Sequence, residues 1–323
     1  MMYKVGDTIS RNPKVNMKSL RIATRGSRLA LIQADQVRRM LQKVRPELEV
    51  STVEVFTKGD RDKSDFLHKA ESVGFFTGEV ERAVLDGRAD IAVHSLKDLP
   101  TAETEGLTIA AIPPRESPAD ALICGGKADS IVALPAGASV GTSSLRRIAQ
   151  VLHIRRDLTC VPLRGNVETR LRKVETGQVD AAIVACAGVN RLGLSEKIAA
   201  TLCPTEFVPA PAQGALAVQA RAEDVETIEL LRQIDDREAR VTAETERQVL
   251  AALHGGCSIP LGVFCRMQGE KLEIHAMLSD TQGGQYIKLS ESCALGEAAV
   301  CARQLAKELL AKGGREILAS LGR

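Results

Sequence analysis

Apolar residues along this chain follow two alternating patterns. Short continuous apolar runs are typical of buried strands, and apolar residues repeated every three or four positions are typical of amphipathic helices. The two patterns alternate from residue 19 to about residue 233. Such alternation predicts mainly parallel sheets with helices on both faces.

The alternation begins again near residue 114. Gly87-Arg-Ala-Asp90 and Gly177-Gln-Val-Asp180 both follow a helical segment and lead into an apolar strand. We interpret them as a weak internal repeat, although any helix–turn–strand unit can look similar. The sequence therefore predicts two related α/β domains, with the Pro- and Gly-rich segment 207–221 returning the chain to the first. Their expected bounds are 19–113 plus 209–233, and 114–208.

From residue 234 onward the pattern changes. A long helical segment that ends near Gly256 is followed by three strand-like segments and a last helix. We expect residues 234–323 to form an α+β domain with a three-stranded antiparallel sheet. Residues 1–18 lack a continuous apolar run, so we interpret them as a flexible extension rather than a signal peptide.

Composition narrows the possible functions. The net charge is +2 and the chain has no Trp, two Tyr and six Phe, which disfavours binding to nucleic acid through charge or base stacking. Its eight cysteines are dispersed, without CxxC pairs or metal-ligand spacing, so we expect no metal site and reduced thiols. The sequence has no run of about 18 apolar residues, so it predicts no membrane span, and we expect a cytoplasmic protein.

Basic and hydroxyl side chains gather where predicted strands end and helices begin. They are Arg25 and Ser27 in the first α/β domain, and Thr142, Ser143, Ser144, Arg146, Arg147, Arg164, Arg170 and Arg191 in the second. Helix-start N–H groups, hydroxyls and guanidinium groups bind carboxylates and phosphates. Any single Arg can be a solvated surface residue, but the set predicts a cleft for a polyanion. Phosphate-binding GxxxxGK[ST] and strand-linked GxGxxG motifs are missing, which favours carboxylates.

The loop "VHSLKDLP", residues 93–100, directly follows a predicted buried strand. Its His, Ser, Lys and Asp suggest a hydrolase triad, but triad members meet in space and no GxSxG motif is present. We interpret it as a loop that presents Lys97 and Asp98 to the cleft. There Asp98 could stabilise a cation developing on a substrate. The alternative is that Asp98 only caps a turn.

One cysteine has an unusual place. Cys257 lies in "LHGGCSIPLG", residues 253–262, at a predicted turn beyond a long helix rather than inside an apolar segment.

Seven stretches, in order along residues 19–312, resemble the porphobilinogen deaminase (hydroxymethylbilane synthase) family. They are "RIATRGSRLALIQA", "ADIAVHSLKDLP", "VGTSSLRR", "LRGNVETRL", "AGVNRLGL", "PAPAQGA" and "GGCSIPLG". The resemblance implies two α/β domains like those of type II periplasmic binding proteins, and a third domain with a three-stranded sheet. It implies a transferase of tetrapyrrole (haem) biosynthesis that joins four porphobilinogen molecules head to tail and releases hydroxymethylbilane.

The same resemblance implies roles for individual residues. Cys257 matches the cysteine that holds a dipyrromethane cofactor through a thioether, and Asp98 matches the catalytic aspartate that hydrogen-bonds pyrrole N–H groups. Ser95, Lys97, Thr142, Ser143, Ser144, Arg146, Arg147 and Arg164 are implied to bind the cofactor, and Arg25, Ser27, Arg170 and Arg191 the substrate. Each pyrrole carries an acetate and a propionate, which accounts for the arginines. No nucleic acid, membrane or metal is implied, and we expect a monomer.

The chain departs from the family at one loop. Many members have Lys-Gly-Leu-Phe where this chain has Val73-Gly74-Phe75-Phe76, so Val73 replaces a lysine of the cleft lid. Lys69 matches an upstream lysine, and we expect either a weaker dependence on this loop or compensation by Lys69 or Lys63 in binding substrate carboxylates. A rival hypothesis is a two-domain protein that binds an organic anion without chemistry. It explains the repeat and the arginines, but neither the third domain nor Cys257.

Overall fold

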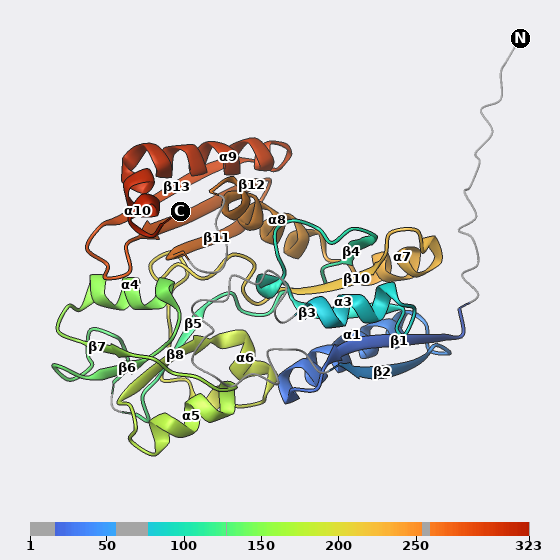
Figure 1. Cartoon of the computed structure of the whole chain (residues 1–323), viewed down its shortest axis with the longest axis horizontal. Helices are drawn as coiled ribbons and strands as arrows, with labels where there is room; N and C mark the ends of the chain where they lie inside the picture. Colours follow the sequence, from blue (N-terminus) through green and yellow to red (C-terminus); the bar gives the residue numbers. More distant parts are fainter. Residues whose placement is uncertain (1–16, 56–76, 127, 254–258, 323) are drawn as a thin grey trace, which may run out of the picture.

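Residues 17–55, 77–126, 128–253 and 259–322 are described by the computed structural model, and their strands form three sheets (Figure 1). The first sheet has the order β2 (Glu49–Val55), β1 (Ser19–Arg25), β3 (Ile91–Ser95), β10 (Leu216–Arg221) and β4 (Leu107–Ala111). The second has the order β7 (Thr159–Val161), β6 (Ser139–Gly141), β8 (Ala181–Ala185), β5 (Asp120–Ile123) and β9 (Ala200–Thr201). The third is β11 (Leu261–Gln268), β12 (Lys271–Ser279) and β13 (Tyr286–Ala294), all antiparallel.

Helices cover each sheet. The first carries α1 (Arg28–Val44), α3 (Gly78–Leu85) and α7 (Val225–Leu231), and the second carries α4 (Leu145–Ile154), α5 (Val167–Glu175) and α6 (Cys186–Arg191). The third is accompanied by α8 (Arg237–Ala252), α9 (Ala298–Leu309) and α10 (Arg315–Ser320). In Figure 1 the two α/β units lie side by side, and the orange and red C-terminal unit lies above them. The predicted architecture, two α/β domains and an α+β domain with a three-stranded antiparallel sheet, is confirmed.

The internal repeat is visible in the hydrogen bonds as well as in the strand order. The Asp90 N–H donates to the Arg21 carbonyl over 2.9 Å, and the Arg21 N–H donates to the Asp90 carboxylate over 2.7 Å. In the second unit Asp180 and Ser139 exchange the same two bonds, over 3.1 and 2.9 Å. The Gly-x-x-Asp segments therefore have equivalent places at the start of β3 and β8.

Both sheets are more mixed than the sequence pattern predicted. β10 runs antiparallel to β3 and β4, and β5 runs antiparallel to β8 and β9. Each of these strands enters its sheet from the other α/β unit, so its direction is set by the crossover and not by a preceding helix. The prediction that segment 207–221 returns to the first sheet is confirmed by β10. The exact domain bounds remain a prediction.

Cys186 corrects a further detail. The apolar run "VDAAIVACAG", residues 179–188, predicts a strand that includes Cys186, but β8 ends at Ala185 and Cys186 is the first residue of α6.

Two segments pass between the α/β units, one containing Arg115 and the other Gln213. Both meet α8 at a buried ion pair. The Arg115 guanidinium donates to both carboxylate oxygens of Glu246, over 2.8 and 2.9 Å, and to the Gln213 carbonyl over 2.9 Å. Glu246, which is fully buried, also accepts the Ala212 N–H over 2.5 Å. This network attaches the C-terminal unit to the junction of the two α/β units.

A second contact joins the C-terminal unit to α4. The His153 and Tyr286 rings stack with centroids 3.9 Å apart. Gly283, in the β12–β13 turn, comes so close that a Cβ atom there would lie 2.3 Å from the Ala149 carbonyl oxygen. The turn can therefore pack on α4 only because this residue has no side chain.

Candidate active site

A cleft of 880 Å³ lies between the two α/β units, and basic side chains from both units line it. Its cations are Arg25, Arg28, Lys97, Arg147, Arg164, Arg170 and Arg191, and its acids are Asp98 and Glu168. Two acids against seven cations make the lining strongly positive, which suits a ligand with several carboxylates.

Sheet topology explains why these residues meet. Arg25 is the last residue of β1 and Ser95 the last of β3, while Lys97 and Asp98 lie in the short 3₁₀ turn η2 (Leu96–Asp98) that follows β3. In the second unit Ser143 follows β6. Carboxyl ends of parallel strands lie at one edge of a sheet, so these residues face the same cleft.

Behind the cleft, Asp120 holds two arginines. Arg146 Nη1 donates to its carboxylate over 2.8 Å, and Arg147 donates through Nε over 3.1 Å and through Nη2 over 2.6 Å. Gln213 Nε2 adds a fourth bond over 2.9 Å. Burial raises the pKa of Asp120, but the charges of Arg146 and Arg147 outweigh burial and hold the pKa well below its usual range. Asp120 is therefore an ionised anchor that fixes the orientation of Arg147 toward the cleft.

Burial also lowers the pKa of three of the lining cations. It lowers the pKa of Lys97 to about 8, against the favourable charge of Asp98. The Lys97 ammonium donates to Gln213 Oε1 over 3.4 Å. Burial lowers the pKa of Arg170 and of Arg191 to about 10, so both stay charged at neutral pH. The Lys97 charge is thus the one most sensitive to mildly alkaline pH among these three.

The predicted hydroxyl residues mainly shape the backbone. Ser27 and Ser144 are the N-caps of α1 and α4, and Ser143 Oγ accepts the Leu163 N–H over 3.1 Å. Ser95 Oγ accepts from Gln33 Nε2 over 2.9 Å. Ser27, Ser95 and Ser143 line the cleft, but Thr142, Ser144 and Arg146 do not. In this structure Arg146 points to Asp120 and to the Val208 carbonyl instead.

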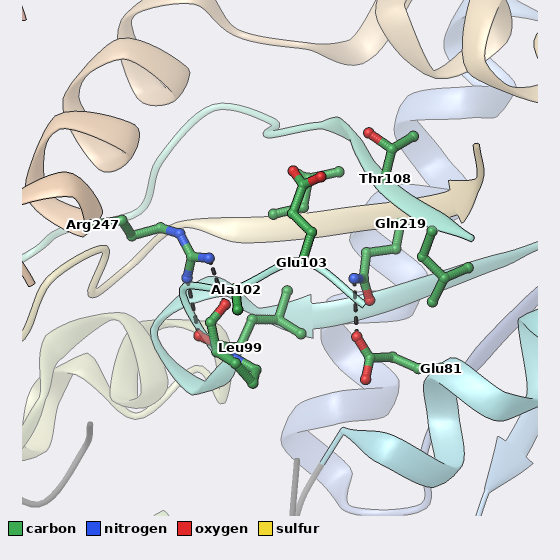
Figure 2. A pocket seen from close by; sticks show the side chains of 10 residues that line it. Glu81, Leu99, Ala102, Glu103, Thr108, Gln219 and Arg247 are labelled. Carbon is green, nitrogen blue, oxygen red and sulfur yellow. Dashed lines mark hydrogen bonds between the residues drawn. The ribbon is translucent and has the colours of Figure 1, made fainter. Parts of the chain in front are cut away.

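Asp98 is exposed in the cleft, and its loop is supported from behind by α8. Arg247 donates to the carbonyls of Leu96, Leu99 and Pro100 over 3.4, 3.0 and 2.6 Å. Figure 2 shows this guanidinium beside Leu99, at the edge of a small pocket that also contains Glu81 and Gln219. Leu96 and Leu99 pack in one buried cluster with Ala239 and Ala243 of α8. The position of Asp98 therefore depends on a helix of the C-terminal unit.

Cys257 and Lys69, with Val73, lie outside the described residues. The sequence shows that Cys257 follows α8 by five residues, since that helix ends at Ala252. Among the described residues, no three His, Cys, Asp or Glu side chains are grouped closely enough to hold a metal ion. In the same part of the chain no helix combines the length and apolar character needed to cross a bilayer.

Sequence reasoning missed Asp120, Gln213, Arg247 and the pair of Arg28 and Glu168. Asp120 carried a signal, because a carboxylate at the start of the apolar run "DALI" must be paired if it is buried. Arg28, Glu168 and Arg247 lie beside polar residues, as ordinary surface residues do, and Gln213 is a single polar residue in the Pro- and Ala-rich stretch "PAPAQGA".

Comparisons with known proteins match most of the chain to one family. Residues 20–229 match the family model "Porphobilinogen deaminase, dipyromethane cofactor binding domain", and residues 240–311 match "Porphobilinogen deaminase, C-terminal domain". A porphobilinogen deaminase of Maridesulfovibrio salexigens is 43% identical over 302 residues, which are 94% of this chain and 98% of that protein. One of Xanthomonas axonopodis pv. citri is 44% identical over 305 residues, 94% of this chain and 100% of that protein.

Among solved structures, substrate binding domain 2 of Lactococcus lactis GlnP in its open conformation is 14% identical, with a TM-score of 0.42. The match covers 68% of this chain and 88% of that one. The two family models together span most of the chain, in the expected order. The chain belongs to the porphobilinogen deaminase family.

Proposed function

We propose that this chain is a hydroxymethylbilane synthase of haem and related tetrapyrrole biosynthesis. It condenses four porphobilinogen molecules onto a covalently held dipyrromethane primer and then releases the linear product with water. In each addition the C–N bond within the aminomethyl group breaks, ammonia leaves, and the methylene carbon becomes the electrophile. A C–C bond then forms to the free pyrrole α-carbon, which loses its proton. The observation that carries the proposal is a cleft of 880 Å³ lined by seven cations, with the exposed Asp98 just beyond the end of β3.

The residues present fit a dipyrromethane, because its side chains are carboxylates and the lining offers guanidinium groups at several depths. When bound, this group supplies the free pyrrole carbon to which the first substrate is joined. Arg147, oriented by Asp120, and Arg170 bind carboxylates in the interior, and Arg25 and Arg164 bind them along the strand ends. Ser143 accepts a backbone N–H from Leu163 and so holds that loop, and Ser95 links the end of β3 to the Gln33 side chain of α1.

Asp98 stabilises the positive charge that develops on pyrrole nitrogen during the condensation. Preorganised charges of this kind contribute most where water is excluded and where they need not reorient during reaction. The bonds from Arg247 to the loop carbonyls meet the second requirement. An organic-anion-binding protein without chemistry would use the same arginines, but family membership favours the enzyme.

Cys257 is the proposed thioether anchor of the dipyrromethane. Mass spectrometry of the intact protein tests this role. Wild-type protein should carry one dipyrromethane adduct and turn pink with Ehrlich's reagent. Cys257→Ala should remain folded but lose adduct, colour and activity, while Cys203→Ala, which changes an exposed free thiol, should keep all three. An adduct that persists in Cys257→Ala would contradict the anchor.

We further propose a monomer that works in the cytoplasm, as expected from the sequence. Light scattering of the purified chain at assay concentration tests the monomer, and a dimer mass would contradict it. Lys69 is kept as a proposed substrate-binding residue. Lys69→Ala with wild-type kinetics would remove it from the site.

A further inference from the structure

An ion pair connects the two α/β units across the cleft. Arg28, the first residue of α1, donates through Nη1 to Glu168 Oε1 in the first turn of α5. The two residues are 140 positions apart in the sequence, and both line the cleft. Their side chains are 61% and 29% exposed, whereas that of Arg147 is 7% exposed. The pair therefore lies at the outer edge of the cleft.

Without its partner, Arg28 would be unfavourable for its helix, and Glu168, although it suits the first turn of α5, would be unfavourable for a bound polyanion. Glu168 is the second acid of a lining that otherwise suits polyanions, and an unpaired carboxylate there would repel them. Arg28 is a cation at the N-terminal end of a 17-residue helix, where the helix dipole favours anions. Pairing removes both conflicts, and a substrate carboxylate in place of Glu168 would also satisfy Arg28.

We propose that Arg28 is a further carboxylate-binding residue, and that Glu168 occupies its guanidinium until a substrate carboxylate displaces it. Exposed ion pairs contribute little stability and are screened by salt, so this pair can exchange partners. The product gains two carboxylates with every added unit, and its later units need cations nearer to solvent than Arg147. Arg28 meets that need. The inference rests on the proposed function and concerns substrate binding within it.

Steady-state kinetics with porphobilinogen, together with intact masses of the enzyme-bound intermediates, test the proposal. Arg28→Gln should raise KM by about tenfold, the scale of one charged hydrogen bond, and should increase the fraction of intermediates with several added units. Glu168→Gln should lower KM, because it frees Arg28. Arg39→Gln is the matched control: it removes another exposed arginine of α1, paired with Asp35 and away from the cleft, and KM should not change.

An exchange of the two charges separates substrate binding from a structural latch. Arg28→Glu combined with Glu168→Arg rebuilds an ion pair between the units but changes the place of the cation. If Arg28 binds substrate, KM stays raised in this double variant. Wild-type KM in the double variant, or in Arg28→Gln, would overturn the proposal while leaving the proposed function intact. Absence of hydroxymethylbilane formation by wild-type protein would instead overturn the function itself. Thermal melting of each variant shows that folding is not the cause of a kinetic change.

Discussion

Replacing Asp120 with Asn tests the internal support of the cleft. The change keeps the shape of the side chain and removes one negative charge at a position with no exposed surface. Arg146 and Arg147, whose side chains are 4% and 7% exposed, then lose their common counter-ion. The new amide can still accept a hydrogen bond from one of the guanidinium groups, but it cannot neutralise them.

The expected loss of stability is large. Removing one partner of a buried ion pair costs about 3–5 kcal/mol, and we expect about 3 kcal/mol because one hydrogen bond survives. Domains unfold with roughly 5–15 kcal/mol in total, so the second α/β unit should lose a substantial part of its stability. Since Arg147 then lacks an anion, bound polycarboxylate should restore more stability to the variant than to wild type.

Urea denaturation of both proteins measures this difference. Asp157→Asn is the control, because Asp157 also pairs with an arginine, Arg155, in the same unit but is 45% exposed. Exposed pairs contribute about 0.2–1 kcal/mol. If Asp120→Asn costs no more than Asp157→Asn, the reasoning about Asp120 is refuted.

The pH dependence supplies a second check on Asp120. Its pKa in the folded protein is depressed by Arg146 and Arg147 despite burial, so its stabilisation is present above the unfolded value of about 3.9. That stabilisation is lost as the pH falls below this value. The difference between wild type and Asp120→Asn should therefore be constant from about pH 5 to 8 and should shrink in acid.

Two other residues give direct predictions. Because burial lowers the pKa of Lys97 to about 8, kcat/KM should fall as the pH rises through about 8, and Lys97→Arg should move this limb to higher pH. If kcat/KM of Lys97→Arg falls at the same pH as that of wild type, Lys97 is not the titrating group. Arg247→Met removes three bonds to the Asp98 loop and should lower kcat by about 100-fold, the scale of a misplacement near 1 Å. Arg237→Met, an exposed position on the same helix, should keep kcat, and an equal loss in both variants would mean that α8 is merely destabilised.

The sequence pattern was sufficient for the fold class, because strand and helix periodicities alternate clearly through both α/β units. It could not give the direction of β5 and β10. An apolar strand has the same pattern in either direction, and the direction here depends on which unit the chain has just left. The end of β8 at Ala185 was also hidden, since the following residues of α6 are small and apolar.

For the site, sequence could place arginines at strand ends but could not orient them. Arg146 and Arg147 are neighbours in the first turn of α4, yet Arg147 lines the cleft and Arg146 does not. The difference comes from Asp120 and the Val208 carbonyl, 26 and 62 residues from Arg146 along the chain. Such contacts follow from the sheet order and crossovers, which local periodicity does not contain.

The two related α/β units differ at one pair of equivalent positions in the cleft. Asp90 and Asp180 make equivalent bonds to β1 and β6, so residues 90 positions apart correspond from there onward. Asp98 then corresponds to Gly188, which also lines the cleft. A Cβ atom at Gly188 would lie 3.2 Å from a methyl group of Val167 and 3.8 Å from one of Leu29. The second unit thus has a glycine at the position equivalent to Asp98, so both units supply cations to the cleft, but the carboxylate that we propose to stabilise charge comes from the first unit.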